Sequence, residues 1–316
     1  MQISRSKVAI VGAGNVGSTF AFSLMISGVA REIVLIDSNQ ERAKGECMDL
    51  SHGASFVQPV NIYSAGYEGC QEADVVVITA GAKQKPGQSR IDLVQTNAEI
   101  FKGIIPKIAK YAKDAILLVV SNPMDILTYI TLKISGLPSN KVMGSGTVLD
   151  SSRFRYLISE HCHLDPRNVH AYIIGEHGDT ELPVWSHANI GGIVLAKYCP
   201  VCDGHCDYKK ELGAIFEEVK NSAYKIIEAK GATYYAIGLA LARIVESMLR
   251  DENSVLPIST LINDYYGIND VCLSIPSVIN RNGVERVLRF ELSGLEQGQL
   301  RHSAMTLKDI IKEIKL

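Results

Sequence analysis

The chain has 316 residues, of which 47% are hydrophobic and 21% are charged, and 32 Lys and Arg against 34 Asp and Glu give a net charge of -2. This composition excludes an intrinsically disordered chain, and the near-neutral balance argues against a nucleic-acid-binding protein that uses a basic surface. Seven cysteines are an odd number in a chain too long to need disulfides, which predicts a reducing, cytoplasmic setting.

A long uncharged stretch at residues 8–30 does not have the sequence of a membrane span or of a secretory signal. Gly12, Gly14, Asn15 and Gly17 interrupt it, leaving a short β-branched run followed by a segment with helical periodicity. We therefore expect a strand, a glycine turn and a helix here, and no association with a membrane.

The first half of the chain alternates short apolar runs with helical segments. The apolar runs, at residues 7–11, 33–36, 75–79 and 116–120, are hydrophobic at both even and odd positions, as strands covered on both faces are. Candidate helices lie between them at about 14–29, 40–55 and 92–111. This alternation predicts an α/β fold in which a Rossmann-type, doubly wound parallel sheet is built with right-handed crossovers.

The pattern changes after Met143. Helical segments at about 149–161, 209–230, 235–250 and 300–315 occur with β-rich runs at 255–264 and 271–279, and Asn282-Gly283 predicts a tight hairpin turn. These features predict a second, mixed α+β domain, so we expect a division into residues 1–143 and 144–316. Because no linker rich in Pro, Gly or Ser separates the halves, we expect them to pack tightly.

Gly12, Gly14 and Gly17 form the pattern Gly-x-Gly-x-x-Gly directly after the first predicted strand. The first glycine permits a tight turn, the second lets the backbone approach a pyrophosphate, and the third allows the helix to pack closely on the strand. Asp37 ends the second predicted strand, twenty residues after Gly17. Its carboxylate would accept hydrogen bonds from ribose hydroxyls and repel a 2′-phosphate, so NAD is favoured over NADP.

Four further segments gather Arg, His, Asp and Asn in predicted loops. They are GAKQKPGQSR at 81–90, SNPMD at 121–125, LDSSRFR at 149–155 and GEHGD at 175–179. With the glycine turn, they resemble the NAD-dependent L-lactate and malate dehydrogenase superfamily, in its order and spacing over essentially the whole chain. The resemblance implies that residues 1–143 bind NAD and that residues 144–316 hold the substrate-binding and catalytic groups.

The resemblance implies an acid/base role for His177, which would donate a proton to the 2-oxo oxygen of the substrate as hydride reaches the neighbouring carbon. Asp150 would accept a hydrogen bond from the other ring nitrogen and favour the imidazolium. Arg153 would bind the substrate carboxylate through two parallel hydrogen bonds, for which a planar guanidinium is suited. Arg90 would polarise the carbonyl group, carried inward by the predicted lid at 81–90.

Three other residues are implied to contact the substrate. Asn122 would hold the carbonyl and the nicotinamide, and Thr233 would line the pocket near the substrate side chain. Gln84 lies where malate dehydrogenases generally have an arginine for a second carboxylate, and a neutral glutamine favours the methyl group of pyruvate. The predicted reaction is therefore reversible hydride transfer between NADH and pyruvate, giving L-lactate and NAD. Alternatives are a malate or other L-2-hydroxy-acid dehydrogenase and, in another class, a noncatalytic NAD-binding protein.

Further contacts with NAD follow from the resemblance alone. The residues that it implies, besides those of the glycine turn and Asp37, are Val16, Arg42, Tyr67, Gly81, Ala82, Asn122 and Ser145. Arg42 and Tyr67 fit ordinary surface residues equally well.

Arg155 follows Arg153 by two residues, so on a helix it points away from the substrate. The resemblance gives it another role, because bacterial allosteric members bind fructose 1,6-bisphosphate with an arginine there and a histidine at the position of His170. We therefore expect a bisphosphate effector at a subunit interface and a homo-oligomer, a tetramer in particular. A surface arginine and a strand-end histidine are the alternative.

Cys199, Cys202 and Cys206, with His205 beside them, have the spacing of a metal knuckle. The resemblance gives them no role, and hydride transfer needs no metal. We expect adventitious thiols in a loop and no metal site.

Overall fold

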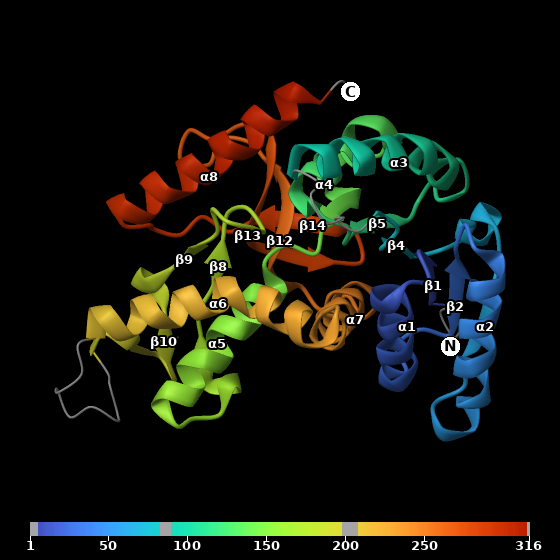
Figure 1. The fold of residues 1–316 in the computed structure, drawn as a ribbon, viewed down its shortest axis with the longest axis horizontal. Coiled ribbons are helices and arrows are strands. Elements are labelled where there is room, and N and C mark those ends of the chain that lie inside the picture. Colours follow the sequence, from blue (N-terminus) through green and yellow to red (C-terminus); the bar gives the residue numbers. More distant parts are fainter. Residues whose placement is uncertain (1–5, 83–89, 198–207, 315–316) are drawn as a thin grey trace.

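The computed structural model describes residues 6–82, 90–197 and 208–314 (Figure 1). Gln84 and the cysteine cluster Cys199, Cys202 and Cys206 with His205 lie outside the described residues. Arg90 begins helix α3, but its side chain also lies outside the described part of the chain.

A nine-stranded sheet forms the centre of the molecule, in the order β14-β13-β12-β6-β5-β4-β1-β2-β3. Six of its strands are parallel: β1 (Lys7–Val11), β2 (Glu32–Ile36), β3 (Asn61–Ser64), β4 (Val75–Ile78), β5 (Ile116–Val119) and β6 (Val142–Gly144). Their order 3-2-1-4-5-6 is that of a doubly wound Rossmann sheet, so the predicted fold class is confirmed. Three antiparallel strands extend it: β12 (Ser254–Ile262), β13 (Val271–Asn280) and β14 (Gly283–Val287).

Helices cover both faces of this sheet. This is required because the even-numbered and the odd-numbered side chains of the strands, which point to opposite faces, are both apolar. In β1, Val8 and Ile10 belong to one core while Ala9 and Val11 belong to the other. The first core contains α1 (Asn15–Ser27), α2 (Gln40–His52) and α7 (Tyr235–Leu249). The second contains α3 (Arg90–Tyr111), α4 (Met124–Ser135) and α8 (Gly294–Glu313) (Figure 1).

A third core lies beside the sheet. Helices α5 (Val148–Cys162) and α6 (Tyr208–Lys230) pack side by side in it (Figure 1). Strands β7 (Val169–His170), β10 (Asn189–Ile190) and β11 (Ile193–Val194) form a small antiparallel sheet there. A separate pair, β8 (Ile173–Ile174) and β9 (Leu182–Pro183), carries the GEHGD segment between its strands. These elements give the second half the mixed α+β character that the sequence predicted.

Several elements differ from the sequence-based expectations. Strand β3 and helix α4 were not anticipated, and α8 begins at Gly294 instead of near residue 300. Ser293 begins α8 because it forms a reciprocal capping box with Glu296, which satisfies free backbone N–H groups. The hairpin loop is Arg281-Asn282, since Asn280 pairs with Gly283. The antiparallel strands of the second half belong to the same sheet as the parallel strands, because β12 pairs with β6. The predicted domain division after Met143 stays a prediction.

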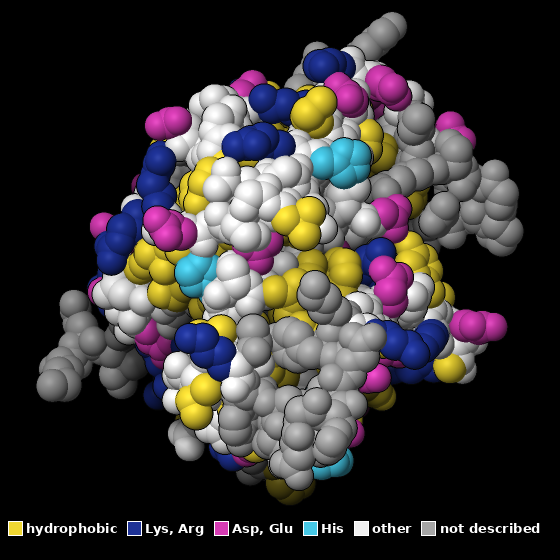
Figure 2. All heavy atoms as spheres, turned by 90° about the vertical axis from the view of Figure 1, so that its left-hand side faces the viewer, with side chains coloured by type: hydrophobic (Ala, Val, Ile, Leu, Met, Phe, Trp, Pro, Cys, Tyr) yellow, Lys and Arg dark blue, Asp and Glu magenta, His cyan; other side chains and the backbone are white. Residues whose placement is uncertain are grey.

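The surface of the described chain adds two findings. On the face shown in Figure 2, Lys and Arg side chains are interspersed with Asp and Glu side chains. Within residues 6–82, 90–197 and 208–314, no helix is long and apolar enough to cross a membrane.

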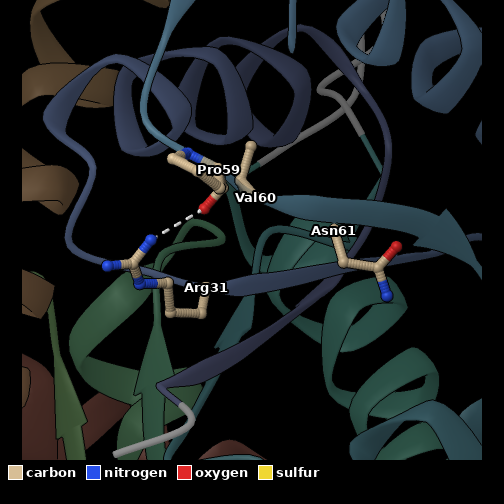
Figure 3. Close-up of a pocket in the computed structure, with 4 residues that line it drawn as sticks. All are labelled: Arg31, Pro59, Val60 and Asn61. Atoms are coloured by element: carbon tan, nitrogen blue, oxygen red, sulfur yellow. Dashed lines mark hydrogen bonds between the residues drawn. The ribbon is translucent and has the colours of Figure 1, made fainter. Parts of the chain in front are cut away.

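A shallow surface pocket lies at the amino ends of β2 and β3. It is lined by Arg31, Pro59, Val60 and Asn61, and Arg31 donates a 3.2 Å hydrogen bond to the carbonyl oxygen of Pro59 across it (Figure 3). The loops that carry the predicted functional residues follow the opposite, carboxyl ends of β1, β4 and β5. In doubly wound sheets ligands bind at the carboxyl ends, so this pocket is not the candidate site.

Candidate active site

The glycine turn between β1 and α1 has a geometry that side chains would prevent. Gly12 has a φ of 112°, and a Cβ atom on it would lie 2.7 Å from the backbone nitrogen of Ala80. A Cβ atom on Gly17 would lie 1.9 Å from the carbonyl oxygen of Gly12, so α1 packs against the turn only because this position is glycine. Among the described residues, a Cβ atom on Gly14 would meet nothing within 4 Å, which leaves the start of α1 open on that part of the structure.

This open helix start fits the pyrophosphate of a dinucleotide. Gly14 is the N-cap of α1, no side chain of the described residues caps the helix, and its first turn has no acidic residue. Free backbone N–H groups and the positive end of the helix dipole therefore face the turn, and both favour an anion. Asp37 braces the same turn, since one oxygen accepts from the N–H of Ala13 at 2.7 Å and the other from the N–H of Asn39 at 2.8 Å. An ionised carboxylate has about four acceptor sites, so it retains capacity for ribose hydroxyls.

Asn97 joins two of the loops that were predicted to contact NAD. Its side chain is 1% exposed, accepts a 2.7 Å hydrogen bond from the N–H of Ala82, and donates one to the carbonyl oxygen of Asn122, also at 2.7 Å. Nearby, buried Ser145 donates its backbone N–H to Val119 at 2.8 Å. The loops after β4, β5 and β6 are thus held at one edge of the sheet, with Asn122 exposed on it.

Tyr67, Val16 and Arg42, which were also predicted to contact NAD, lie in different environments. Burial raises the pKa of Tyr67, and the charges of Cys70 and Asp37 add to this rise. Val16 is partly buried at the start of α1. Arg42 lies in the first turn of α2 and forms a 3.7 Å ion pair with Glu46, as an ordinary surface arginine does.

His177, Asp150 and Arg153 form one hydrogen-bonded cluster. The Nδ1 atom of His177 lies 2.6 Å from Oδ2 of Asp150, and Arg153 donates to Oδ1 of the same carboxylate at 2.7 Å. Asp150 is 3% exposed in the first turn of α5, whereas the His177 side chain is 27% exposed. Because Nδ1 faces Asp150, the Nε2 atom is the ring nitrogen left to exchange a proton with a substrate.

Asp150 also sets the protonation state of His177. Burial alone lowers the pKa of the imidazole, but the charge of Asp150 and the hydrogen bond to it more than offset this effect and raise the pKa to about 9. The reciprocal interaction with His177 and Arg153 lowers the pKa of Asp150 despite its burial. At neutral pH the cluster therefore holds an ionised carboxylate and a protonated imidazolium, which can act as a general acid.

The backbone of the His177 loop is held as firmly as the ring. The N–H of His177 donates at 2.7 Å to Asp125, a buried carboxylate of α4 that also accepts from Ser259 Oγ at 2.6 Å. One residue earlier, the N–H of Glu176 donates to Ser303 Oγ of α8 at 2.7 Å. Elements from four parts of the chain thus fix the imidazole relative to the sheet.

Thr233, Arg155 and His170 are further predicted residues that the structure describes. Thr233 is half-buried in the loop between α6 and α7. Arg155 packs against its own chain: its Nε donates to the carbonyl oxygen of Ala171 at 3.0 Å, and its guanidinium lies 5.3 Å from the Tyr172 ring centroid. His170 is exposed at the end of β7.

The sequence reasoning missed Asn97 and Asp125, although each carried a signal. Asn97 lies at helical spacing with the buried Val94 and Phe101 of α3, and a polar residue on such an apolar face must have a buried partner. Asp125 belongs to the SNPMD segment and precedes a run of buried residues, but its partner, His177, is 52 positions away. No local pattern identifies such a partner.

Comparisons with known proteins show the family to which the chain belongs. Residues 6–144 match the family described as lactate/malate dehydrogenase, NAD binding domain, and residues 147–316 match its alpha/beta C-terminal domain. The chain is 57% identical to an L-lactate dehydrogenase from Acetivibrio thermocellus (98% of each chain) and 55% identical to one from Thermoanaerobacterium saccharolyticum (98% of this chain, 100% of the other). A crystal structure of minor L-lactate dehydrogenase from Enterococcus mundtii in the ligands-bound form superposes with a TM-score of 0.94 at 44% identity, covering 98% of this chain and 99% of that one. The chain belongs to the lactate/malate dehydrogenase family.

Proposed function

We propose that this chain is an NAD-dependent L-lactate dehydrogenase, which reversibly converts pyruvate and NADH to L-lactate and NAD. The observation that carries the proposal is the His177–Asp150–Arg153 cluster, in which an imidazolium and a guanidinium share one buried carboxylate. A 2-oxo acid needs a proton for its carbonyl oxygen and a cation for its carboxylate, and this cluster offers both. The L-lactate dehydrogenases at 57% and 55% identity support the choice of reaction.

The residues of this chain have distinct tasks in that reaction. NADH, when bound along the glycine turn and Asp37, supplies the hydride for carbon 2 of pyruvate. His177 gives the proton on Nε2 to the carbonyl oxygen, while Asp150 keeps the ring oriented through Nδ1. Arg153 binds the carboxylate with the N–H donors that Asp150 does not use. Arg90 and Asn122 from the NAD-binding half, and Thr233 from the catalytic half that is proposed to begin near Met143, are proposed to complete the site.

Substrate choice is proposed to depend on Gln84. The test compares kcat/KM for pyruvate, oxaloacetate and 2-oxoisocaproate in the wild type and in Gln84→Arg, with Gln71→Arg as a control for an added surface charge. We expect pyruvate to be preferred by the wild type and the variant to move toward oxaloacetate, because an arginine can pair with a second carboxylate. A wild-type preference for oxaloacetate would overturn the proposed substrate, and an unchanged ratio in Gln84→Arg would reject Gln84 as the selector.

A regulatory anion site at Arg155 and His170 is proposed on the resemblance to allosteric bacterial members. The support is their adjacency, since Arg155 bonds to Ala171, the residue after His170. The expected ligand is fructose 1,6-bisphosphate at an interface of a homotetramer, where a phosphate would reduce repulsion between cations. The test records pyruvate saturation curves and sedimentation with and without the bisphosphate, for the wild type, His170→Ala and the control His302→Ala. Identical wild-type curves would reject the site.

A cytoplasmic location is proposed from cysteine chemistry. Cys47, Cys70 and Cys272 are buried free thiols in the described part of the chain, as in proteins that fold in a reducing compartment. Fractionation of the source cells, with an activity assay on each fraction, tests this location.

A further inference from the structure

A second buried carboxyl group lies beside the His177–Asp150 pair. Glu181 directly precedes β9, and His177 lies on the same short connection from β8. The N–H of Glu181 donates to the carbonyl oxygen of Gly178 at 3.1 Å, which folds this connection into a turn. The turn brings Glu181 back toward His177: one side-chain atom each of Asp150, His177 and Glu181 lie within 4.8 Å of one another.

Glu181 differs from Asp150 in how its charge is compensated. Its side chain is buried, at 7% exposure, yet within the described part of the chain its carboxyl group forms no hydrogen bond or ion pair. Asp150, in contrast, is bonded to both His177 and Arg153. Burying a carboxyl group without a direct partner is unfavourable for its ionised form, so Glu181 must share the charges of the cluster to ionise.

Charged groups face Glu181 from two helices and from its own turn. Burial raises its pKa to about 8 and the charge of Asp150 adds to the rise, whereas His177, Arg153 and, from α6, Lys220 act in the opposite direction. Asp125 of α4 accepts from the backbone N–H of His177, and its charge also raises the pKa of the imidazole. Glu181 and His177 therefore change charge in neighbouring pH ranges, and each one affects the other.

We propose that Glu181 is a third ionisable partner of the His177–Asp150 pair. The charge of Glu181 helps His177 to retain its proton and thereby extends pyruvate reduction to higher pH. The inference rests on the proposed function for its kinetic consequence. The physical reason is that an ionised Glu181 places a second negative charge within 4.8 Å of the imidazole, and this charge stabilises the imidazolium. Glu181 acts through His177 and is a positioning residue of the site, not a group that touches substrate.

The test is a pH titration of His177 by nitrogen-15 NMR in the free enzyme labelled at histidine, with the His177→Gln variant used to assign the signal. In Glu181→Gln we expect the pKa of His177 to fall by about one unit or more, because two charges about 5 Å apart in a partly buried site interact that strongly. Glu181→Asp keeps the charge and should restore most of the difference. Glu228→Gln, an exposed glutamate on α6, is the matched control and should leave the pKa unchanged.

Kinetics give the second measurement. The alkaline limb of kcat/KM for pyruvate should move to lower pH in Glu181→Gln by the same amount as the NMR pKa. An unchanged His177 pKa in folded Glu181→Gln, shown by a normal thermal transition and NADH binding, would overturn the inference. If the wild type fails to reduce pyruvate while the NMR shift is present, the proposed function fails and the charge coupling stands.

Discussion

Replacing Asp150 with Asn tests the hydrogen bond that defines the candidate site. In the folded protein the pKa of His177 is raised from 6.5 to about 9, mainly by Asp150 acting against burial. Without the Asp150 carboxylate, burial is opposed only by the weaker charges of Glu181 and Asp125, and we expect the pKa of His177 to fall to about 6.5 or below. At pH 8 the protonated fraction of His177 then drops from about nine-tenths to about three-hundredths or less. We therefore expect kcat/KM for pyruvate to fall at least about 30-fold at pH 8, with further loss from misorientation of the ring.

The same substitution has a defined effect on stability. A histidine whose pKa is raised on folding stabilises the fold fully below its unfolded pKa, and this contribution is lost as the pH rises through the folded pKa. The shift of His177 corresponds to about 3 kcal/mol. We expect Asp150→Asn to lower the free energy of unfolding by about this amount at pH 6, with a difference that narrows as the pH rises through 9.

Two measurements check this reasoning. Rate profiles from pH 5.5 to 10.5 locate the alkaline limb, and urea unfolding at pH 6 and pH 10 measures the stability difference. Glu160→Gln, the same chemical change at an exposed position of α5, is the control and should match the wild type in both. An alkaline limb in Asp150→Asn that coincides with that of the wild type, or a rate within about three-fold at pH 8, would refute the argument.

Three further predictions concern the supports of the site. Burial raises the pKa of Asp125 to about 6, so its ionised form, which accepts hydrogen bonds from both His177 and Ser259, is lost below that pH. We therefore expect the acid limb of kcat/KM near pH 6 to disappear in Asp125→Asn. An acid limb that persists in this variant would contradict the assignment to Asp125. Asn97→Ala should cost about 1–3 kcal/mol in unfolding free energy by leaving buried backbone groups unpaired, and should weaken NADH binding measured by fluorescence titration. Gly12→Ala should weaken NADH binding at least as strongly as Asn97→Ala. An alanine at this positive φ costs about 1–3 kcal/mol, and its Cβ atom would crowd the backbone of Ala80. An NADH affinity equal to that of the wild type would argue against the strained turn.

Local patterns predicted much of the fold and part of the site. The strands at 7–11 and 116–120 were identified within a residue because parallel strands covered on both faces have apolar side chains pointing to both faces. His177, Asp150 and Arg153 were named from short motifs, and the structure brings them into one cluster. The bond between Asp150 and Arg153 itself was not anticipated, because the motif suggests a substrate as the only partner of the arginine.

What the sequence by itself determined is therefore local: the periodicity of strands and helices, the glycine positions that a tight turn requires, and residue types suited to acid/base chemistry. The tertiary structure alone decided which distant groups meet: Asp125 with the backbone of His177, Asn97 with two loops, and Glu181 with the His177–Asp150 pair. It also decided that three antiparallel strands extend the parallel sheet. The physical reason is that charge coupling and buried hydrogen bonds depend on distances in space, which only the packing of helices against both faces of the sheet creates.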